Sequence, residues 1–192
     1  KRSMGSFKHV GLNVAADPFM NSAVTGANGG MVVVSADDPG MHSSQNEQDS
    51  RFFAEFAKIF CFEPSTQQEA YDMTLAAFET SEKFGLPVML RLVTRLAHSR
   101  SSVTTGDRRV QNELKPGAWN RWTLLPGPAK KGFAMLLENQ PKLTAFSDAS
   151  PFNFLSLEGG RSLGVIAAGI AFNYLMEAAA DGPAMPYLKI ST

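Results

Sequence analysis

The apolar run from Met31 to Val34 passes without interruption into a stretch of short polar side chains that extends from Asp37 to Ser50. An apolar run without alternation is typical of a parallel strand that is covered on both faces. In open α/β sheets, ligands bind beyond the carboxyl ends of such strands, so ligand contacts are expected in the polar stretch. An ordinary solvated loop that caps the next helix is the alternative. The sequence thus predicts a buried strand over 31–35 and leaves both interpretations of the loop open.

Strands and helices are predicted to alternate over the first hundred residues. The reason is that short apolar runs typical of strands alternate with segments whose apolar residues recur at helical spacing. A first short strand is expected to end over residues 7–10, and further strands are expected over 31–35, 60–63 and 88–96. The expected helices are 15–27, 51–59 and a segment between Thr66 and Gly85. Thr66 and Glu69 have the spacing of a capping box at the start of the last helix. Such alternation predicts an α/β fold with a mainly parallel sheet flanked by helices and connected by right-handed crossovers.

A linker is predicted after the first hundred residues, because Ser, Thr, Gly, Pro and charged residues dominate as far as about Pro128. The linker is expected to occupy residues 101–160, and residues 161–192 would start a second α/β domain. The elements expected in these parts are a short helix over 130–139, a strand over 163–169, a helix over 170–180 and a strand from Pro186. Because the chain begins and ends close to predicted strands, we interpret it as an excerpt that lacks both ends of a larger protein.

Composition and charge argue against several classes of partner and location. Lysine plus arginine equal aspartate plus glutamate at 18 each, so no basic surface for nucleic acid or anionic lipid is expected. No apolar run reaches the roughly 20 residues that span a bilayer. The apolar segment of a signal peptide does not follow Lys1 and Arg2. We therefore expect a cytoplasmic protein with neither a membrane nor a nucleic-acid partner.

The chain contains one cysteine, Cys61, inside the apolar segment Ile59–Phe62. A buried structural thiol is expected there, rather than a nucleophile or a metal ligand. One cysteine completes neither a disulfide nor the ligand set of an iron–sulfur cluster, and no metal-binding residues are expected in this chain.

Three separated motifs carry a resemblance to a known family. They are Lys8–Pro18, Asp37–Asp49 and the group Thr94, Arg95, His98, Ser99 and Arg100. In this order they closely resemble the alpha subunit of indolepyruvate:ferredoxin oxidoreductases, and the similarity returns at Leu163 to Tyr174. The resemblance implies a thiamine diphosphate-dependent oxidoreductase that decarboxylates aryl 2-oxoacids, passes electrons through iron–sulfur clusters to ferredoxin and releases an acyl-CoA.

The same resemblance implies which modules the chain contains. Residues 1–100 would be the later part of the pyrimidine-binding module of the thiamine diphosphate-binding fold. Residues 161–192 would be the start of a domain like the carboxy-terminal domain of transketolase. The glutamate that activates the aminopyrimidine, the diphosphate-binding module with its metal motif and the cysteine-rich segments are not found in this sequence.

These modules define the expected cofactors and partners. Thiamine diphosphate with magnesium is the expected cofactor, although the module that binds the diphosphate is not in this chain. The 4Fe-4S clusters are expected in the full-length protein and not in this chain. The expected partners are an aryl 2-oxoacid, coenzyme A, ferredoxin and the beta subunit, in an oligomer. The 192-residue chain by itself is expected to be inactive.

Candidate site residues come from the first two motifs and from the segment after the last strand of the first domain. The candidate catalytic residues are His9 and His42. The candidate cofactor-binding residues are Lys8, Gly11 and Asn13, and the candidate substrate-binding residues are Ser43, Ser44, Gln45, Asn46 and Arg95. Polar donors in the loop would bind an oxyanion in a site that excludes water. We expect the loop over 42–49 to face a cleft beside Lys8 and His9, because both segments follow strands that end at one edge of the sheet.

Structural alternatives stay open for the histidines and the glycines. His9 would then be a hydrogen-bonded structural histidine, and the His42 loop would be a helix cap. Gly11, Gly30 and Gly40 fit turns better than a phosphate cradle, since no Gly-x-Gly-x-x-Gly pattern is present.

The charged residues have similar alternatives. Glu47 and Asp49 fit the dipole at a helix amino terminus better than a metal pair or a general acid and base. Arg95, His98 and Arg100 would engage a carboxylate or a coenzyme A phosphate. Solvated linker charges are the alternative for these three residues.

Two rival functions come from different classes of protein. One is a pyruvate or other 2-oxoacid:ferredoxin oxidoreductase, which would share the fold and the electron acceptor. The other is a non-catalytic interaction fragment that keeps only the fold.

Overall fold

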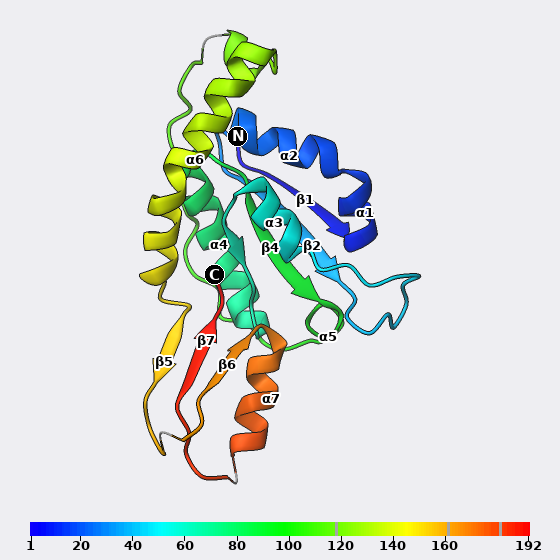
Figure 1. Cartoon of the computed structure of the whole chain (residues 1–192), viewed down its shortest axis with the longest axis vertical. Coiled ribbons are helices and arrows are strands. Elements are labelled where there is room, and N and C mark those ends of the chain that lie inside the picture. Colours follow the sequence, from blue (N-terminus) through cyan, green and yellow to red (C-terminus); the bar gives the residue numbers. More distant parts are fainter. Residues whose placement is uncertain (118, 161, 181) are drawn as a thin grey trace.

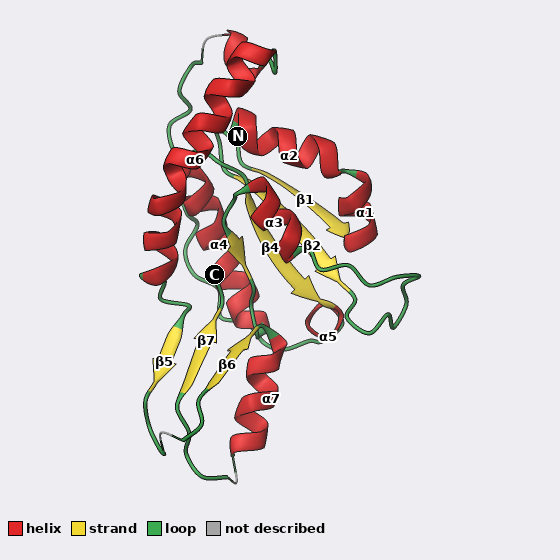
Figure 2. Ribbon diagram, in the orientation of Figure 1, coloured by secondary structure: helices red, strands yellow, loops and turns green. Residues whose placement is uncertain are grey.

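A computed structural model describes residues 1–117, 119–160, 162–180 and 182–192 of the chain. The strands form two sheets, a four-stranded sheet in the order β1-β2-β4-β3 and a three-stranded sheet in the order β5-β7-β6 (Figures 1 and 2). The first sheet contains β1 (Ser3–Lys8), β2 (Met31–Asp37), β3 (Cys61–Phe62) and β4 (Val88–Val93), all parallel. Its connecting helices are α1 (His9–Val14), α2 (Ala16–Thr25), α3 (Arg51–Ala57) and α4 (Gln67–Phe84). The predicted α/β fold with a parallel sheet flanked by helices is confirmed.

The helices cover both faces of the first sheet. The chain moves in one direction along the sheet from β1 to β2 and on to β3, and then steps back to β4. Right-handed crossovers therefore place α2 and α3 on one face and α4 on the other, as Figure 1 shows. Both faces of β2 are covered in this way, which explains why its apolar run does not alternate.

Two local patterns of the sequence, the apolar run of β2 and the capping residue of α4, are confirmed by the structure. Val32 and Val33 of β2 are buried in the cluster that also holds Met73 of α4. Thr66 caps α4 as predicted, because its hydroxyl accepts a hydrogen bond of 3.1 Å from the Glu69 amide. The strand and the helix that packs on it were both identified from their patterns alone.

Two short helices replace predicted ends of strands. β1 ends at Lys8 and α1 begins at His9, so Gly11 is helical and the turn predicted there is wrong. β4 ends at Val93, and α5 (Thr94–Ala97) follows where the strand was predicted to continue. Helices of one or two turns are too short to show a hydrophobic period, which is why neither was predicted.

The helix predicted over 130–139 is much longer than expected. A short 3-10 helix (Trp119–Trp122) precedes α6 (Pro126–Asp148), a helix of 23 residues that includes Pro141. Proline normally breaks a helix, but burial of Leu136 and Leu143 against the first core offsets its cost here. Among the helices in the described residues, α6 included, none is long and apolar enough to cross a membrane.

The segment from residue 101 to 117 has no regular secondary structure but is bound to α4. The Thr104 amide donates to the Gln68 side chain at 2.8 Å, and the Asn112 amide donates to Glu82 at 3.2 Å. Glu82 also forms an ion pair of 2.7 Å with Arg2 at the start of the chain. This part of the predicted linker is therefore attached to α4 by hydrogen bonds, although it forms no helix or strand.

The second sheet lies beyond the carboxyl edge of β3 and carries one helix. It contains β5 (Phe154–Ser156), β6 (Val165–Ala168) and β7 (Tyr187–Ile190), and its helix is α7 (Ile170–Ala179). β6 and β7 are parallel and were predicted, whereas β5 is antiparallel to β7 and was not. A 2.8 Å hydrogen bond from the Glu63 amide to the Ser191 carbonyl joins the two sheets, and a partly buried ion pair joins Lys189 of β7 to Glu69 of α4.

Replacing Met73 with Ala is expected to lower the free energy of unfolding by about 2–5 kcal/mol, because a fully buried side chain would leave a cavity. The matched control is Met4→Ala in β1, where the side chain is 58% exposed and the expected change is within about 0.5 kcal/mol. Urea unfolding of both variants measures the difference. Equal losses would show that Met73 does not hold the core between α4 and the sheet.

Candidate functional site at the carboxyl edge of the first sheet

Asp38 holds the polar loop that follows β2. Its carboxylate accepts hydrogen bonds from the His42 amide (3.2 Å), the Ser43 amide (2.8 Å) and the Ser44 hydroxyl (2.5 Å). The Thr94 hydroxyl at the start of α5 donates a fourth bond of 2.7 Å. The bonds from Ser44 and Ser43, followed by the one from Thr94, hold the pKa of Asp38 far below its ordinary value. The loop, which projects from the sheet edge in Figure 1, is therefore fixed at its base by one ionised carboxylate.

The two other carboxylates of the loop have different roles. Glu47 accepts a hydrogen bond of 3.1 Å from the Gly40 amide, so its predicted place at a helix terminus is wrong. Gly40 lies at φ +79°, in the left-handed region that favours glycine, and thus forms the predicted turn. Asp49 does lie at the start of α3, where it accepts a bond of 3.0 Å from the Arg51 amide. Burial raises the pKa of Asp49, but the hydrogen bonds from Arg51 outweigh it, so this pKa is lowered.

Lys8 and His9 contact the same loop, as the sequence predicts. The Lys8 ammonium donates to the Ser43 carbonyl at 2.9 Å. The Nε2 atom of His9 lies 3.1 Å from the Asn46 carbonyl, which only accepts, so we assign the ring proton to Nε2. His9 is buried, and its Nδ1 atom has no hydrogen-bond partner among the described residues. His9 is thus a structural support of the loop that retains one unused acceptor.

Two cavities of about 340 Å³ each open on either side of Thr94. The first cavity, beside β1, is lined by Lys8, Ser43 and His98 together with Asp38 and Thr94. The second cavity, beside α7, is lined by His42, Arg95 and Tyr174 together with Pro39, Val93, Thr94 and Ile170. The Arg95 guanidinium lies 5.6 Å from the centre of the Tyr174 ring, a cation–π contact that joins α5 to α7. Of the candidate residues, Lys8 and Ser43 therefore line the first cavity, and His42 and Arg95 line the second.

Several candidate residues line neither cavity, and His9 is one of them. Gly11 and Asn13 lie within α1, and the Asn13 side chain is exposed on that helix. Gln45 is exposed, and Asn46 contributes its carbonyl to His9. Ser44 donates its hydroxyl to Asp38.

The prediction that donors of this loop bind an oxyanion has to be corrected, because three of these donors already have a partner. The His42 and Ser43 amides and the Ser44 hydroxyl donate to Asp38 within the loop. An internal carboxylate therefore takes the donors that were expected to bind an oxyanion. The exposed His42 side chain is the group of the loop that faces the second cavity.

A buried cluster of charges next to the site was not predicted. Arg91 of β4 forms ion pairs with Asp37 at 2.7 Å and with Glu63 at 2.6 Å. The same Asp37 accepts a bond of 2.9 Å from the Ser50 amide, at the residue before α3. Arg51 lies at the rim, 2.6 Å from Asp49 and 3.7 Å from Glu63. Asp37, Glu63 and Arg91 come from β2, from the residue after β3 and from β4, respectively, so no spacing in the sequence could have indicated that these three charges meet.

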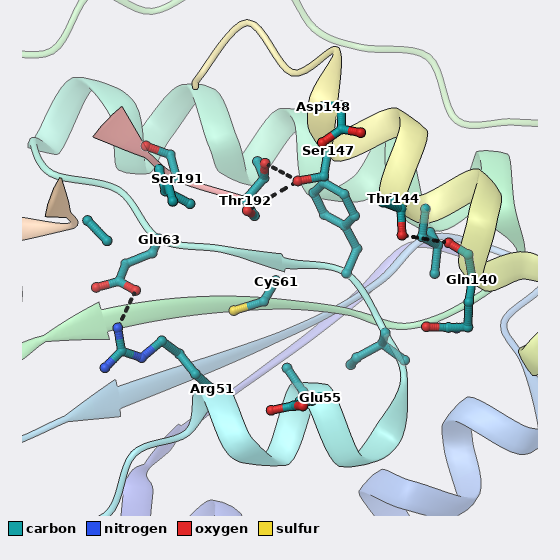
Figure 3. Close-up of a pocket in the computed structure, with 16 residues that line it drawn as sticks. Arg51, Glu55, Cys61, Glu63, Gln140, Thr144, Ser147, Asp148, Ser191 and Thr192 are labelled. Carbon is teal, nitrogen blue, oxygen red and sulfur yellow. Dashed lines mark hydrogen bonds and ion pairs between the residues drawn. The ribbon is translucent and has the colours of Figure 1, made fainter. Parts of the chain in front are cut away.

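The only cysteine lines a larger cavity at the outer edge of β3. This cavity has a volume of about 560 Å³ and lies between α3, α6 and the end of β7. Figure 3 shows Cys61 in its wall, the Arg51–Glu63 ion pair at one end, the hydrogen bonds between Ser147 and Thr192 above it, and Gln140 with Thr144 at the other end. Burial raises the pKa of the Cys61 thiol to about 12, so the thiol is protonated at neutral pH and is a poor nucleophile. Within the described residues, no group of three or more His, Cys, Asp or Glu side chains is placed to hold a metal ion.

Replacing Asp38 with Asn is expected to lower the melting temperature most between pH 5 and 7. The native pKa of Asp38 lies below the unfolded value of about 3.9, so its contribution to stability is complete above that value and is lost as the pH falls further. The difference between the wild-type chain and the variant should therefore shrink as the pH falls below about 4. Thermal unfolding followed by circular dichroism from pH 7 to pH 2 measures it. A difference that does not change with pH would contradict the assigned role of the carboxylate.

Replacing Arg91 with Ala is expected to lower the free energy of unfolding by about 3–5 kcal/mol, because Asp37 and Glu63 would keep buried charges without their partner. The matched control is Arg109→Ala, which breaks the exposed ion pair with Glu79 and should cost about 0–1 kcal/mol. Chemical unfolding of both variants gives the two values. A loss below about 1 kcal/mol for Arg91→Ala would show that the cluster does not hold the sheet edge.

Comparison with known proteins shows which proteins the chain is similar to. The family described as "Pyruvate flavodoxin/ferredoxin oxidoreductase, thiamine diP-bdg" matches residues 31–124. The chain is 43% identical over its full length to the indolepyruvate oxidoreductase subunit IorA of Archaeoglobus fulgidus, and 44% identical over 98% of its length to the IorA subunit of Methanothermobacter marburgensis. It spans 31% of the length of each of these relatives.

A solved structure has the same fold. It is a 2-oxoglutarate:ferredoxin oxidoreductase from Magnetococcus marinus, determined with 2-oxoglutarate, coenzyme A and succinyl-CoA bound. The match has a TM-score of 0.69 with 16% sequence identity, and it covers 100% of this chain and 42% of that one. The sequence similarity to the IorA subunits and the shared fold agree with the resemblance found from the motifs. The chain is thus similar over nearly all of its length to part of the indolepyruvate oxidoreductase subunit IorA, and residues 31–124 match a family of thiamine diphosphate-binding oxidoreductase domains.

Proposed function

We propose that the chain is part of a thiamine diphosphate-dependent oxidoreductase that converts aryl 2-oxoacids of the indolepyruvate type to acyl-CoA and passes the electrons to ferredoxin. The observation that carries this proposal is the identity of 43–44% with IorA subunits over 98–100% of the chain. The polar loop held at the carboxyl edge of the parallel sheet supports it, because ligands bind at this edge in α/β folds.

The residues at this edge fit the polar ring of the cofactor. His9 supports the site from behind, because it is buried and its Nε2 atom holds the Asn46 carbonyl of the loop that lies beside Lys8. Lys8 uses one of its three N–H groups for the Ser43 carbonyl and keeps two for a ligand in the first cavity. When bound, thiamine diphosphate supplies a nucleophilic carbon and an electron sink for decarboxylation.

The second cavity supplies groups for the oxoacid. The Arg95 guanidinium is positively charged and would pair with the carboxylate of the substrate. Tyr174 and Ile170 offer an apolar and aromatic wall for an aryl side chain. The exposed imidazole of His42 would donate a hydrogen bond or exchange a proton, since the Asp38 contacts fix the loop that carries it.

Other parts of the complete enzyme are expected to supply the remaining functions. We expect the diphosphate and its magnesium ion to bind to a separate module. Binding the cofactor costs roughly 4–15 kcal/mol of lost translational and rotational freedom, which contacts to the pyrimidine alone would not offset. We therefore expect the isolated chain neither to bind thiamine diphosphate tightly nor to be active. Iron–sulfur clusters, the beta subunit, ferredoxin and coenzyme A complete this proposal, for an enzyme of the cytoplasm.

Substrate assays of the complete enzyme test the proposed function directly. With coenzyme A and ferredoxin present, indolepyruvate should be oxidised with a kcat/KM at least about tenfold above that of pyruvate or 2-oxoglutarate, since an aryl side chain fills an apolar cavity that smaller groups leave partly empty. A preference for pyruvate or 2-oxoglutarate would favour the alternative 2-oxoacid oxidoreductase. Absence of turnover with all three oxoacids would favour a non-catalytic role.

Replacing His42 with Ala in the complete enzyme should lower oxoacid turnover at least about tenfold and change the melting temperature little, because an exposed loop side chain contributes little burial. The control is Met41→Ala, which alters an exposed neighbour in the same loop and should leave turnover within about twofold. Steady-state kinetics and thermal unfolding are measured on the same preparations. Parallel loss of activity and stability in His42→Ala would assign the residue to the structure of the loop.

A further inference from the structure

Arg95 carries the only permanent charge among the described residues that line the second cavity, and its hydrogen-bond donors are unused. Within the part of the chain that the structure describes, its guanidinium forms no ion pair. What it does contact is the ring of Tyr174, whose centre lies 5.6 Å away. A cation–π contact uses the positive charge and not the N–H groups, so the donors of Arg95 stay free for a ligand.

Tyr174 belongs to the helix of the second sheet, and the residue before it fixes that helix to the first part of the chain. The Asn173 side chain donates a hydrogen bond of 2.7 Å to the Ser65 carbonyl, next to the residue that caps α4. The start of α7 is also held close, since a Cβ atom at Gly169 would lie only 2.3 Å from the Glu63 carboxylate. The ring of Tyr174 therefore projects from a backbone that is fixed relative to the candidate site.

Arg95 projects from an equally fixed backbone. Thr94, the residue before it, donates to the Asp38 carboxylate at 2.7 Å and to the Asp37 carbonyl at 3.0 Å. An exposed arginine has many rotamers, and ordering it when a ligand binds reduces affinity. A ring that is already in place restricts these rotamers before the ligand arrives.

We propose that Tyr174 is a positioning residue, whose ring holds the Arg95 guanidinium at the second cavity for recognition of the carboxylate of a 2-oxoacid. This inference rests on the proposed function, in which Arg95 pairs with that carboxylate. Tyr174 acts on the carboxylate only through Arg95. The carboxylate subsite is then assembled from both sheets, because α5 follows the first sheet and α7 belongs to the second.

The choice of oxoacid separates this role from a direct contact between the ring and an aryl side chain. Every 2-oxoacid has the same carboxylate, so a change that acts through Arg95 weakens the binding of all of them by a similar factor. Loss of an aryl contact weakens the binding of aryl oxoacids alone. Indolepyruvate and pyruvate are therefore compared, and pyruvate is measured as a competitive inhibitor if its turnover is too slow.

Steady-state kinetics of the complete enzyme with Tyr174→Leu and Tyr174→Phe test the proposal. Leucine removes the ring, so the KM of indolepyruvate and the KM or inhibition constant of pyruvate should both rise about three- to tenfold. The kcat should stay within about twofold, because the contact acts on binding and not on the chemical step. Phenylalanine keeps the ring and should leave all constants within about twofold of wild type.

The matched control is Met176→Leu, which changes an exposed side chain (42%) on the same helix that does not line the cavity. It should leave the constants of both oxoacids unchanged. Thermal unfolding verifies that each variant is folded, and Tyr174→Met is used if Tyr174→Leu is not. Equal effects of Tyr174→Leu and Tyr174→Phe, or an effect confined to indolepyruvate, would overturn the proposal.

A double-mutant cycle shows whether the ring acts through the guanidinium. Arg95→Ala should raise the constants more than Tyr174→Leu does, and adding Tyr174→Leu to it should change them by less than about twofold further. Effects that multiply independently would overturn the proposal. Turnover with unchanged constants in Tyr174→Leu would overturn this inference alone. Absence of turnover with every oxoacid would instead overturn the proposed function, and this inference with it.

Discussion

The ion pair between Asp37 and Arg91 connects the last residue of β2 to the neighbouring strand β4, and the carboxyl edge of the sheet depends on it. The register of these parallel strands places Arg91 opposite Ser35, so Arg91 and Asp37 lie on the same face two positions apart. Neither charge is stable there alone, because burial of an unpaired charge costs several kcal/mol. Asp37 also holds the Ser50 amide. One carboxylate thus fixes two strands and the helix α3 relative to each other.

Asp38, the next residue, organises the ligand side of the same edge. Successive side chains leave a strand on opposite faces, so Asp38 points away from the charge cluster and toward Thr94 and the loop. Its hydrogen bonds occupy the amides of His42 and Ser43. The groups left for a ligand are therefore side chains: His42 and Arg95 in the second cavity, and Lys8 in the first.

The parts of the fold that depend on one local pattern could be predicted from the sequence. The apolar run identified β2, the Thr66 cap identified the start of α4, and the order of strands placed the polar loop beside Lys8 and His9. Features that depend on distant partners could not be predicted. The helix α6 continues through Pro141 because Leu143 is buried on another element, and no local signal shows that burial.

The same limit explains the misjudged roles within the candidate site. Ser44 has a hydroxyl in a polar loop, and its sequence neighbours do not show that Asp38 takes this donor. Arg91 lies in an apolar strand, where its charge could only be explained once Glu63 and Asp37 were seen around it. Sequence patterns locate a polar edge, but hydrogen-bond partners decide which of its groups stay free for a ligand.

A loop that is fixed before any ligand arrives has a physical advantage for binding. Ordering a flexible loop at the moment of binding would cost roughly 1–2 kcal/mol for each residue whose backbone becomes fixed. Here Asp38 and Lys8 hold the loop from two sides, through contacts to His42, Ser43 and Ser44 that need no ligand. That ordering cost is met when the chain folds, so the free energy of contacts to any bound ligand is available for affinity and orientation. The loop donors that bind Asp38 therefore contribute indirectly, because their hydrogen bonds hold the His42 side chain at the second cavity.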